Sequence, residues 1–138
     1  MELPPALEKK FQTLLLRYPI KRSALVPMAV YGQDVFGFVS DDLIAEIARR
    51  LDLNTLQVRE TLEYYSMIRR KPAGKYHVQV CTNVSCMLRG GNALYEFIQK
   101  KLEIGNKEVS ADGVFSLEEV ECIGACTGAP ALQVNYDF

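Results

Sequence analysis

Four cysteines are the side chains of this sequence best suited to metal or redox chemistry. Cys81 and Cys86 form one close pair in CTNVSC, and Cys122 and Cys126 form a second in CIGAC. A stretch of 35 residues separates the two pairs, and no other cysteine is present. Two such pairs can form disulfides, bind zinc, act as a redox dithiol or hold an iron–sulfur cluster.

The rest of the sequence disfavours the first three of these chemistries. The N-terminal residues MELPPALEKK lack the regions of a signal peptide, so an oxidising compartment that would favour disulfides is not expected. Structural zinc sites often include histidine, but the only histidine, His77, lies in a strand-like pattern. A thioredoxin-type dithiol requires the spacing CxxC, which does not occur.

An iron–sulfur cluster ligated by cysteine alone agrees best with two pairs. Each iron of a [2Fe–2S] cluster takes two protein ligands, so two short loops can supply one pair each. The spacing differs from that of plant-type and bacterial-type ferredoxins, and a Rieske centre would need two histidines. From the residues, a [2Fe–2S] cluster is the favoured hypothesis, and a structural zinc site is the alternative.

Two long stretches carry a more specific signal, GKYHVQVCTNVSCMLRGG and SADGVFSLEEVECIGACTGAPALQVN. Together with FGFVS at residues 36–40 and the pair Tyr64-Tyr65, they resemble the thioredoxin-like [2Fe–2S] subunit of respiratory complex I, NADH:quinone oxidoreductase. The resemblance covers nearly the whole chain. It implies that one [2Fe–2S] cluster is the cofactor and that its ligands are Cys81, Cys86, Cys122 and Cys126.

The resemblance also implies a function. In that family the cluster exchanges single electrons with the flavin of a partner subunit that oxidises NADH. We therefore expect an oxidoreductase subunit that is not catalytic alone, with FMN and NADH bound by a partner flavoprotein and with further subunits of a respiratory complex. The same module resembles subunits of NAD-linked hydrogenases and formate dehydrogenases, which are the alternatives for the parent complex. A zinc-stabilised structural or regulatory module is the alternative of another class.

Composition is typical of a soluble globular protein. The chain has 138 residues, of which 49% are hydrophobic and 24% charged, and no apolar run approaches the ~20 residues of a membrane span. The formal net charge of −1 gives no general attraction to nucleic acid. The absence of an Arg- and Ser-rich presequence favours the bacterial cytoplasmic side or a mature chain. The resemblance implies a place in the peripheral arm of an inner-membrane complex, on the matrix side in a mitochondrion.

Residues 1–70 predict four amphipathic helices. The first has Pro4 and Pro5 in its first turn and is ended by Pro19, and the second covers residues 25–36 and stops at Gly37. Ser40 and Asn54 are the expected N-caps of the third and fourth helices. The apolar face of the fourth helix includes Leu62 and Tyr65. Basic and acidic residues nearly balance here, which disfavours a DNA-binding helix-turn-helix.

Beyond RRKPAG at residues 69–74 the apolar period changes from 3.6 to 2. A half-buried strand over residues 76–80 should deliver Cys81, with His77 facing solvent. A helix capped by Asn92 should follow and bury Leu94, Phe97, Ile98 and Leu102. A turn at Asp112-Gly113, a strand with a bulge at Glu118-Glu119, and a last strand over residues 132–136 complete the pattern.

These patterns predict an α+β protein. Residues 1–70 are expected to form an N-terminal helical bundle, which the resemblance implies docks a partner. Residues 71–138 are expected to form a thioredoxin-like α/β domain with both cysteine pairs in loops at one end. The resembled subunits usually continue into a closing C-terminal helix, which this sequence lacks, so one sheet face is expected to offer apolar surface. Negative charge at Glu118, Glu119 and Glu121 is expected to lower the reduction potential of the cluster.

Overall fold

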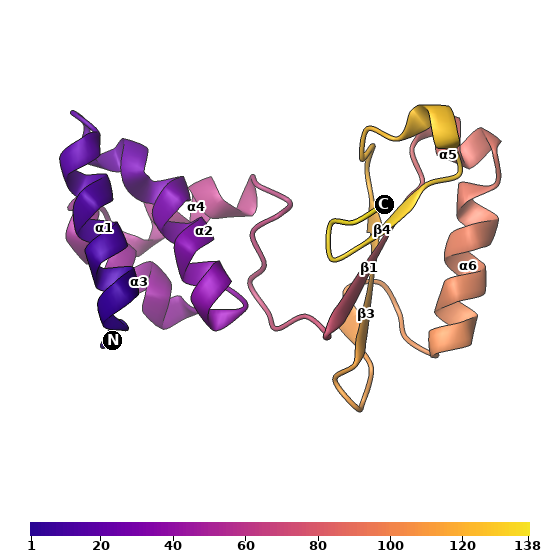
Figure 1. The fold of residues 1–138 in the computed structure, drawn as a ribbon, viewed down its shortest axis with the longest axis horizontal. Coiled ribbons are helices and arrows are strands. Elements are labelled where there is room, and N and C mark those ends of the chain that lie inside the picture. The colour runs from indigo at the N-terminus through magenta and orange to yellow at the C-terminus, as the bar shows by residue number, and fades with distance from the viewer. The chain divides into compact units, whose positions relative to one another are not determined.

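The computed structural model describes residues 1–138, and these divide into two compact units, Met1–Pro72 and Ala73–Phe138 (Figure 1). The sequence placed the boundary between residues 70 and 71, two residues earlier. The first unit is helical, and the second combines a sheet with helices. The α+β class predicted from the change of period is confirmed, with the helices first and the thioredoxin-like part second.

The first unit consists of four α-helices around one apolar core. They are α1 (Pro5–Arg17), α2 (Leu25–Phe36), α3 (Asp41–Leu51) and α4 (Thr55–Glu63), with a short 3₁₀ helix (Lys21–Ala24) before α2. Side chains spaced by three or four residues along each helix point inward, as an amphipathic helix requires. The largest of the fully buried core residues are Phe11, Leu7, Leu25, Met28, Leu43, Ile44, Ile47 and Leu62.

The predicted helix ends agree with the observed caps. The Ser40 hydroxyl oxygen accepts a hydrogen bond from the Leu43 amide at 3.2 Å and begins α3. Asn54 and Gln57 exchange the two hydrogen bonds of a capping box at the start of α4. Gly37 ends α2 in the left-handed conformation, with φ at 81°. However, α4 ends at Glu63, so Tyr65 lies beyond the helix and is partly exposed instead of continuing the buried face.

A charged cluster joins α1 to α3. The Arg50 guanidinium donates to both Glu8 oxygens, at 2.9 and 2.6 Å, and to Glu46 Oε1 at 2.7 Å. Arg49 also donates to Glu46. Hydrogen bonds from Arg49 and Arg50 lower the pKa of the buried Glu46 carboxyl to about 2, so this carboxylate is paired and charged within the bundle.

The second unit is built on a four-stranded sheet in the order β2-β3-β1-β4. The strands are β1 (Tyr76–Cys81), β2 (Glu108–Val109), β3 (Phe115–Val120) and β4 (Leu132–Val134). The central pair β1 and β3 is parallel, whereas β4 and β2 pair antiparallel to β1 and β3 respectively. Helix α5 (Val84–Leu88) and helix α6 (Gly91–Leu102) connect β1 to β2 (Figure 1).

Helix α6 covers one face of this sheet. Val78, Val80 and Leu117 project from β1 and β3 and form a core with Ile104, against which Leu94 and Ile98 of α6 pack. The residues between them project to the opposite face, because successive side chains of a strand alternate. None of the helices is both long and apolar enough to cross a membrane.

Several sequence predictions for this unit were wrong. His77 is only 7% exposed and does not face solvent, because the second sheet face carries buried polar side chains. The register from Tyr76↔Phe115 to Cys81↔Val120 is continuous, so there is no bulge at Glu118-Glu119. The apparent break in alternation arises because Glu119, which is in phase with Phe115 and Leu117, is exposed, whereas the apolar Val120 projects to the second face and is partly buried.

Helix α6 also differs from its prediction. It begins at Gly91 with Gly90 as N-cap, so Asn92 lies inside the first turn and does not cap it. Leu94, Ile98 and Leu102 pack against the sheet as expected, but Phe97 is 62% exposed. Three short elements were not predicted: the single-turn helix α5, the two-residue strand β2 and a 3₁₀ helix at Cys126–Gly128. The Asp112-Gly113 turn joins β2 to β3, and Gly113 takes the left-handed conformation, with φ at 71°.

Candidate metal centre

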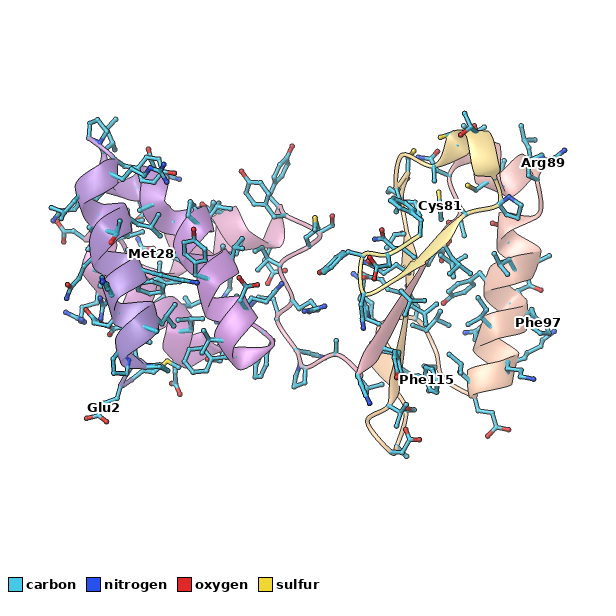
Figure 2. The ribbon with its side chains drawn as sticks, in the orientation of Figure 1. Glu2, Met28, Cys81, Arg89, Phe97 and Phe115 are labelled. Carbon is cyan, nitrogen blue, oxygen red and sulfur yellow. The ribbon has the colours of Figure 1, made fainter.

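The two cysteine pairs converge because of how the sheet is connected. Cys81 is the last residue of β1, and Cys122 follows two residues after β3 ends at Val120. Since β1 and β3 are parallel neighbours, their C-terminal ends lie at the same edge of the sheet. Residues far apart in the sequence therefore reach one place, the end of the sheet that carries α5 and the labelled Cys81 (Figure 2).

The first pair is held in a short, buried segment. Asn83 is the N-cap of α5, and its side-chain oxygen accepts a hydrogen bond from the Val84 amide at 2.7 Å. This one-turn helix carries Cys86, which is 2% exposed, while Cys81 is 1% exposed. The start of α6 packs closely on both residues, since a Cβ at Gly91 would lie 2.7 Å from the Cys81 carbonyl oxygen. The Cys81 and Cys86 backbones are thus fixed by close contact.

The second pair lies in an exposed loop. The Cys122 and Cys126 sulfurs are 3.5 Å apart, and Cys126 begins a short 3₁₀ turn that ends at Gly128. Between them, Gly124 has φ at 82°, a left-handed conformation that suits glycine, and its amide donates to Cys122 Sγ at 3.4 Å. The glycine in this loop thus turns its amide toward a cysteine sulfur.

The two loops pack on each other and share hydrogen bonds. Cys81 and Cys86 form a small buried cluster with Ala131, and the Cys81 amide donates to the Ala131 carbonyl at 3.1 Å. The Thr82 hydroxyl donates to Glu119 Oε1 at 2.7 Å. These contacts make one platform from the ends of β1 and β3 and the segment before β4.

The pKa values of the thiols differ with their surroundings. The Gly124 amide, and then the Cys126 side chain, lower the pKa of Cys122. Burial is the main cause that raises the pKa of Cys86, and the hydrogen bond with Cys122 raises the pKa of Cys126. Metal ligation requires thiolates. Cys122 is therefore the most readily ionised of these three sulfurs, and it lies in the exposed loop.

The donor set suits a two-iron cluster. The sulfurs belong to two pairs, one in the buried segment after β1 and one in the exposed loop, where the Cys122 and Cys126 sulfurs are 3.5 Å apart. A [2Fe–2S] cluster takes one pair at each iron. The Gly124 amide, directed at Cys122 Sγ, is the kind of donor that stabilises an anionic iron–sulfur centre.

The acidic residues near the loops have different surroundings. Glu118 is bound by His77 and Gln79 on the second sheet face. Glu119 accepts from Thr82, and Glu121 accepts from the Asn83 side chain at 3.1 Å. Glu119 and Glu121 are thus attached to the segment between Cys81 and Cys86. The effect of the three carboxylates on a reduction potential stays a prediction.

Sequence reasoning missed the residues that support the ligand loops. Asn83 followed by an apolar run is an N-cap signal, but α5 is too short to show helical periodicity. The Gly90-Gly91 pair was the only sequence signal for the close approach of Gly91 to the cysteine backbones. Such a pair by itself indicates a flexible turn. The hydrogen bonds of Thr82 and Asn83 to Glu119 and Glu121 leave no local pattern in the sequence.

Comparisons with known proteins show which family this chain is related to. A family model described as thioredoxin-like [2Fe-2S] ferredoxin matches residues 11–138. The E subunit of NADH-quinone oxidoreductase from Rickettsia typhi is 38% identical over 130 residues, which cover 92% of this chain and 76% of that protein. The E subunit numbered 2 of the same enzyme from Rhizobium meliloti is 36% identical over 132 residues, covering 96% of this chain and 79% of that protein.

Two further comparisons cover less of the other protein. The E subunit of the same enzyme from Mycobacterium tuberculosis is 36% identical over 132 residues, which are 52% of its length. Among solved structures, an NAD⁺-reducing [NiFe]-hydrogenase in the H₂-reduced state matches with a TM-score of 0.69 at 19% identity, over 81% of this chain. This chain spans only 19% of the hydrogenase chain, and the likeness concerns the fold.

The match to the family extends over most of the sequence and includes both cysteine pairs. The cofactor of the family is the [2Fe–2S] cluster for which the two loops supply a suitable donor set. By sequence and by fold, this chain belongs to the thioredoxin-like [2Fe–2S] ferredoxin family.

Proposed function

We propose that this chain is the electron-transfer subunit of an NADH-oxidising complex of the NADH-quinone oxidoreductase type. Cys81 and Cys86 ligate one iron of its [2Fe–2S] cluster, and Cys122 and Cys126 ligate the other. One observation carries the proposal: the only four cysteines of the chain meet as two pairs at one edge of the sheet. The curated relatives, which are E subunits of NADH-quinone oxidoreductase, supply the type of complex.

The chain's own residues give each pair a separate role. Cys81 and Cys86 are buried and fixed by Gly91 and Ala131, so they anchor the cluster to the fold. Cys122 and Cys126 lie in the exposed loop, so their side of the site faces outward. When bound, the cluster supplies one-electron transfer. The buried pair excludes water, and the exposed pair gives a partner access to the site.

The proposed electron partner is a flavoprotein subunit that binds FMN and NADH. The first unit, residues 1–72, is proposed to dock this or a neighbouring subunit, since it contributes no cysteine and has its own complete core. Further subunits of a respiratory complex would complete the assembly, with this chain in its peripheral arm on the cytoplasmic or matrix side. The chain is proposed to convert no organic substrate alone.

A place in an NAD-linked hydrogenase is the alternative, but the observations favour it less. The hydrogenase match has 19% identity, whereas the NADH-quinone oxidoreductase relatives reach 36–38% over nearly the whole chain. The hydrogenase comparison therefore supports the fold, and the sequence relatives support the parent complex. A zinc module, the alternative of another class, makes a different prediction about metal content.

The test is anaerobic purification of the full chain with iron, sulfide and zinc analysis. Two irons and two sulfides per chain are expected, together with a spin-one-half EPR signal that appears only on reduction by dithionite. Each of the four Cys→Ser variants should lose most of this signal, whereas Val84→Ser, on the exposed side of α5, should keep it. Stoichiometric zinc after anaerobic reconstitution with iron and sulfide would refute the proposal, and so would a Cys→Ser variant with unchanged iron content and EPR spectrum.

A further inference from the structure

A connected set of polar side chains lies on the sheet face opposite α6. His77 Nδ1 is 2.8 Å from Ser116 Oγ, and His77 Nε2 is 3.2 Å from Glu118 Oε2. The Gln79 side-chain amide donates to the same Glu118 oxygen at 3.0 Å, and Gln133 donates to Gln79 Oε1 at 2.7 Å. The set therefore links β1, β3 and β4 by side chains as well as by backbone.

The side chains of this polar set are buried, although they include a histidine beside a carboxylate. His77 is 7% exposed, Gln79 6% and Ser116 3%. Buried polar groups are tolerated when they are hydrogen-bonded, and a buried charge requires a partner. Here the partner is Glu118, whose pKa is lowered chiefly by its hydrogen bond with His77. The carboxylate is thus held charged next to the imidazole.

The geometry keeps both ring nitrogens of His77 paired in either protonation state. In the neutral ring, Nε2–H donates to Glu118 and Nδ1 accepts from the Ser116 hydroxyl. In the charged ring, Nδ1–H donates to Ser116 Oγ, because a hydroxyl oxygen both donates and accepts. Ser116 Oγ also accepts from the Gly74 amide at 3.0 Å, which fixes its position. The site can therefore gain a proton at Nδ1 without leaving a ring nitrogen unpaired.

Few charged groups face this site. Glu118 contacts the imidazole from β3, and the Lys107 ammonium, from the segment before β2, lies 3.9 Å from the other Glu118 oxygen. The Lys107 side chain is 73% exposed, so its charge is largely screened by solvent. From the end of β4, Asn135 contributes only a neutral amide oxygen, which accepts from the His77 backbone amide. The carboxylate of Glu118 is the main charge that a protonated ring would meet.

The polar set lies on the strands that lead to the candidate cluster site. His77, Gln79 and Cys81 project from the same face of β1, so His77 lies four residues before a ligand, or ~13 Å at the rise of a strand. At that separation and an effective dielectric constant of about 20, one added charge changes a proton's binding constant by about tenfold. A reduced cluster carries one more negative charge than an oxidised one.

We propose that His77, held by Glu118 and Ser116, is a proton-binding site coupled to the cluster. When the cluster accepts one electron from its reductant, His77 binds a proton from solvent at Nδ1 more tightly, and it releases that proton more readily when the electron leaves. Reduction is thus accompanied by partial uptake of one proton, and no bond other than N–H forms or breaks. This inference rests on the proposed function, since it requires a cluster at Cys81 and the other three cysteines.

The experiment uses the fact that His77 is the only histidine of the chain. Its ring ¹⁵N and ¹H resonances are followed by NMR against pH in the full anaerobic protein, once oxidised and once reduced with dithionite. The titration midpoint is expected to be about one pH unit higher in the reduced protein, which means that the proton binds roughly tenfold more tightly. Equal midpoints in the two states, or a ring that does not titrate in either, would overturn the inference.

A potentiometric titration gives the second measurement. The midpoint potential of the cluster is expected to fall with rising pH in the wild type and to become nearly independent of pH in His77→Gln. Glu96→Gln, an exposed carboxylate on α6 and thus on the other side of the sheet, should keep the wild-type slope. A His77→Gln slope equal to that of the wild type contradicts the coupling. If His77→Gln does not fold, the wild-type NMR titration decides.

Metal analysis of the same sample distinguishes a failure of the proposed function from a failure of the proton coupling at His77. A wild-type protein that binds no iron after reconstitution contradicts the proposed function and removes this inference with it. A protein with two irons and two sulfides, whose histidine titrates identically in both states, contradicts this inference alone.

Discussion

Glu119 accepts a hydrogen bond from the Thr82 hydroxyl at 2.7 Å, and this bond joins the end of β3 to the loop that follows β1. The two residues are distant in sequence, and each lies one to three residues from a candidate ligand. Glu121 and Asn83 make a parallel contact at 3.1 Å. The two ligand loops are therefore joined to each other by side-chain hydrogen bonds.

Loss of the Thr82–Glu119 hydrogen bond should speed the removal of iron from the site more than it lowers the free energy of unfolding. In Thr82→Val the hydroxyl is removed with little change of shape, and we expect a cost of about 1 kcal/mol or less in the free energy of unfolding, because the bond is exposed. The rate at which an iron chelator bleaches the visible absorption should rise several-fold. Thr127→Val, in the exposed second loop, is the control. Equal bleaching rates in the two variants would contradict a tethering role.

Gly91→Ala should disrupt the first ligand pair. A Cβ there would lie 2.7 Å from the Cys81 carbonyl oxygen and 2.9 Å from the Cys86 carbonyl, both backbone atoms that cannot rotate away. We expect roughly 1–3 kcal/mol of destabilisation and a low iron content after reconstitution. Gly128→Ala is the matched control, since its Cβ meets nothing within 4 Å. Iron analysis and thermal unfolding of the two variants check the prediction, which fails if both retain two irons and the same melting temperature.

Gly124→Ala tests backbone conformation, because there is free space around this residue but φ is 82°. An alanine held in the left-handed region costs about 1–2 kcal/mol, and relief of that strain would turn the amide away from Cys122 Sγ. Loss of this donor should lower the midpoint potential of the cluster. Gly124→Asn, which tolerates the conformation better, should lie between alanine and wild type. A potential unchanged in both variants would show that this amide does not tune the cluster.

The carboxylates after β3 give a prediction about potential. Replacing Glu118, Glu119 and Glu121 together by Gln should raise the midpoint potential, because a reduced cluster is disfavoured by nearby negative charge. Glu119 and Glu121 should contribute most, since they contact the segment between Cys81 and Cys86, whereas Glu118 is paired with His77. Glu108→Gln, at the far strand β2, is the control. Redox titration monitored by EPR measures the shift, and an unmoved triple variant would refute it.

Acid should destabilise the helical unit through Glu46. Its pKa is lowered to about 2 in the folded protein from an ordinary value of 4.5. A carboxyl whose folded pKa is depressed contributes stability above its unfolded pKa, and that stability is lost as pH falls from 4.5 toward 2. The contribution is up to about 3 kcal/mol. Glu46→Gln should flatten this part of the stability curve, measured by denaturant unfolding with circular dichroism, whereas the exposed Glu60→Gln should not.

The helical unit was the most predictable part of the sequence. Its helix ends depend on local signals, such as the cap at Ser40, the capping box at Asn54 and the stop at Gly37, and all three are present. Local side-chain-to-backbone bonds are formed by residues three or four apart, so a linear pattern contains them. Tyr65 was predicted on the buried face because the apolar spacing continues past the point where α4 ends.

The sheet was less predictable because its second face is buried by polar side chains, whereas only the face under α6 is apolar. His77 was predicted to face solvent since polar residues alternate with valines in β1, but the second face is closed by polar partners that come from β3 and β4. Such pairs form only after distant strands align, so no window of neighbouring residues reveals them. The ligand set itself was accessible from cysteine type and spacing together with the resemblance to a family, and its assignment to Cys81, Cys86, Cys122 and Cys126 stays a prediction.

Because α6 lies between β1 and β3 in the sequence, the candidate ligands come from segments before and after this helix. A cluster bound there would act as a cross-link between positions 81 and 126, closing a long loop of the unfolded chain much as a disulfide does. Cross-links of that span remove chain entropy equivalent to roughly 4 kcal/mol from the unfolded state. Loss of iron and loss of order in the second unit should therefore be coupled events, while the helical unit, which contains no cysteine, is spared.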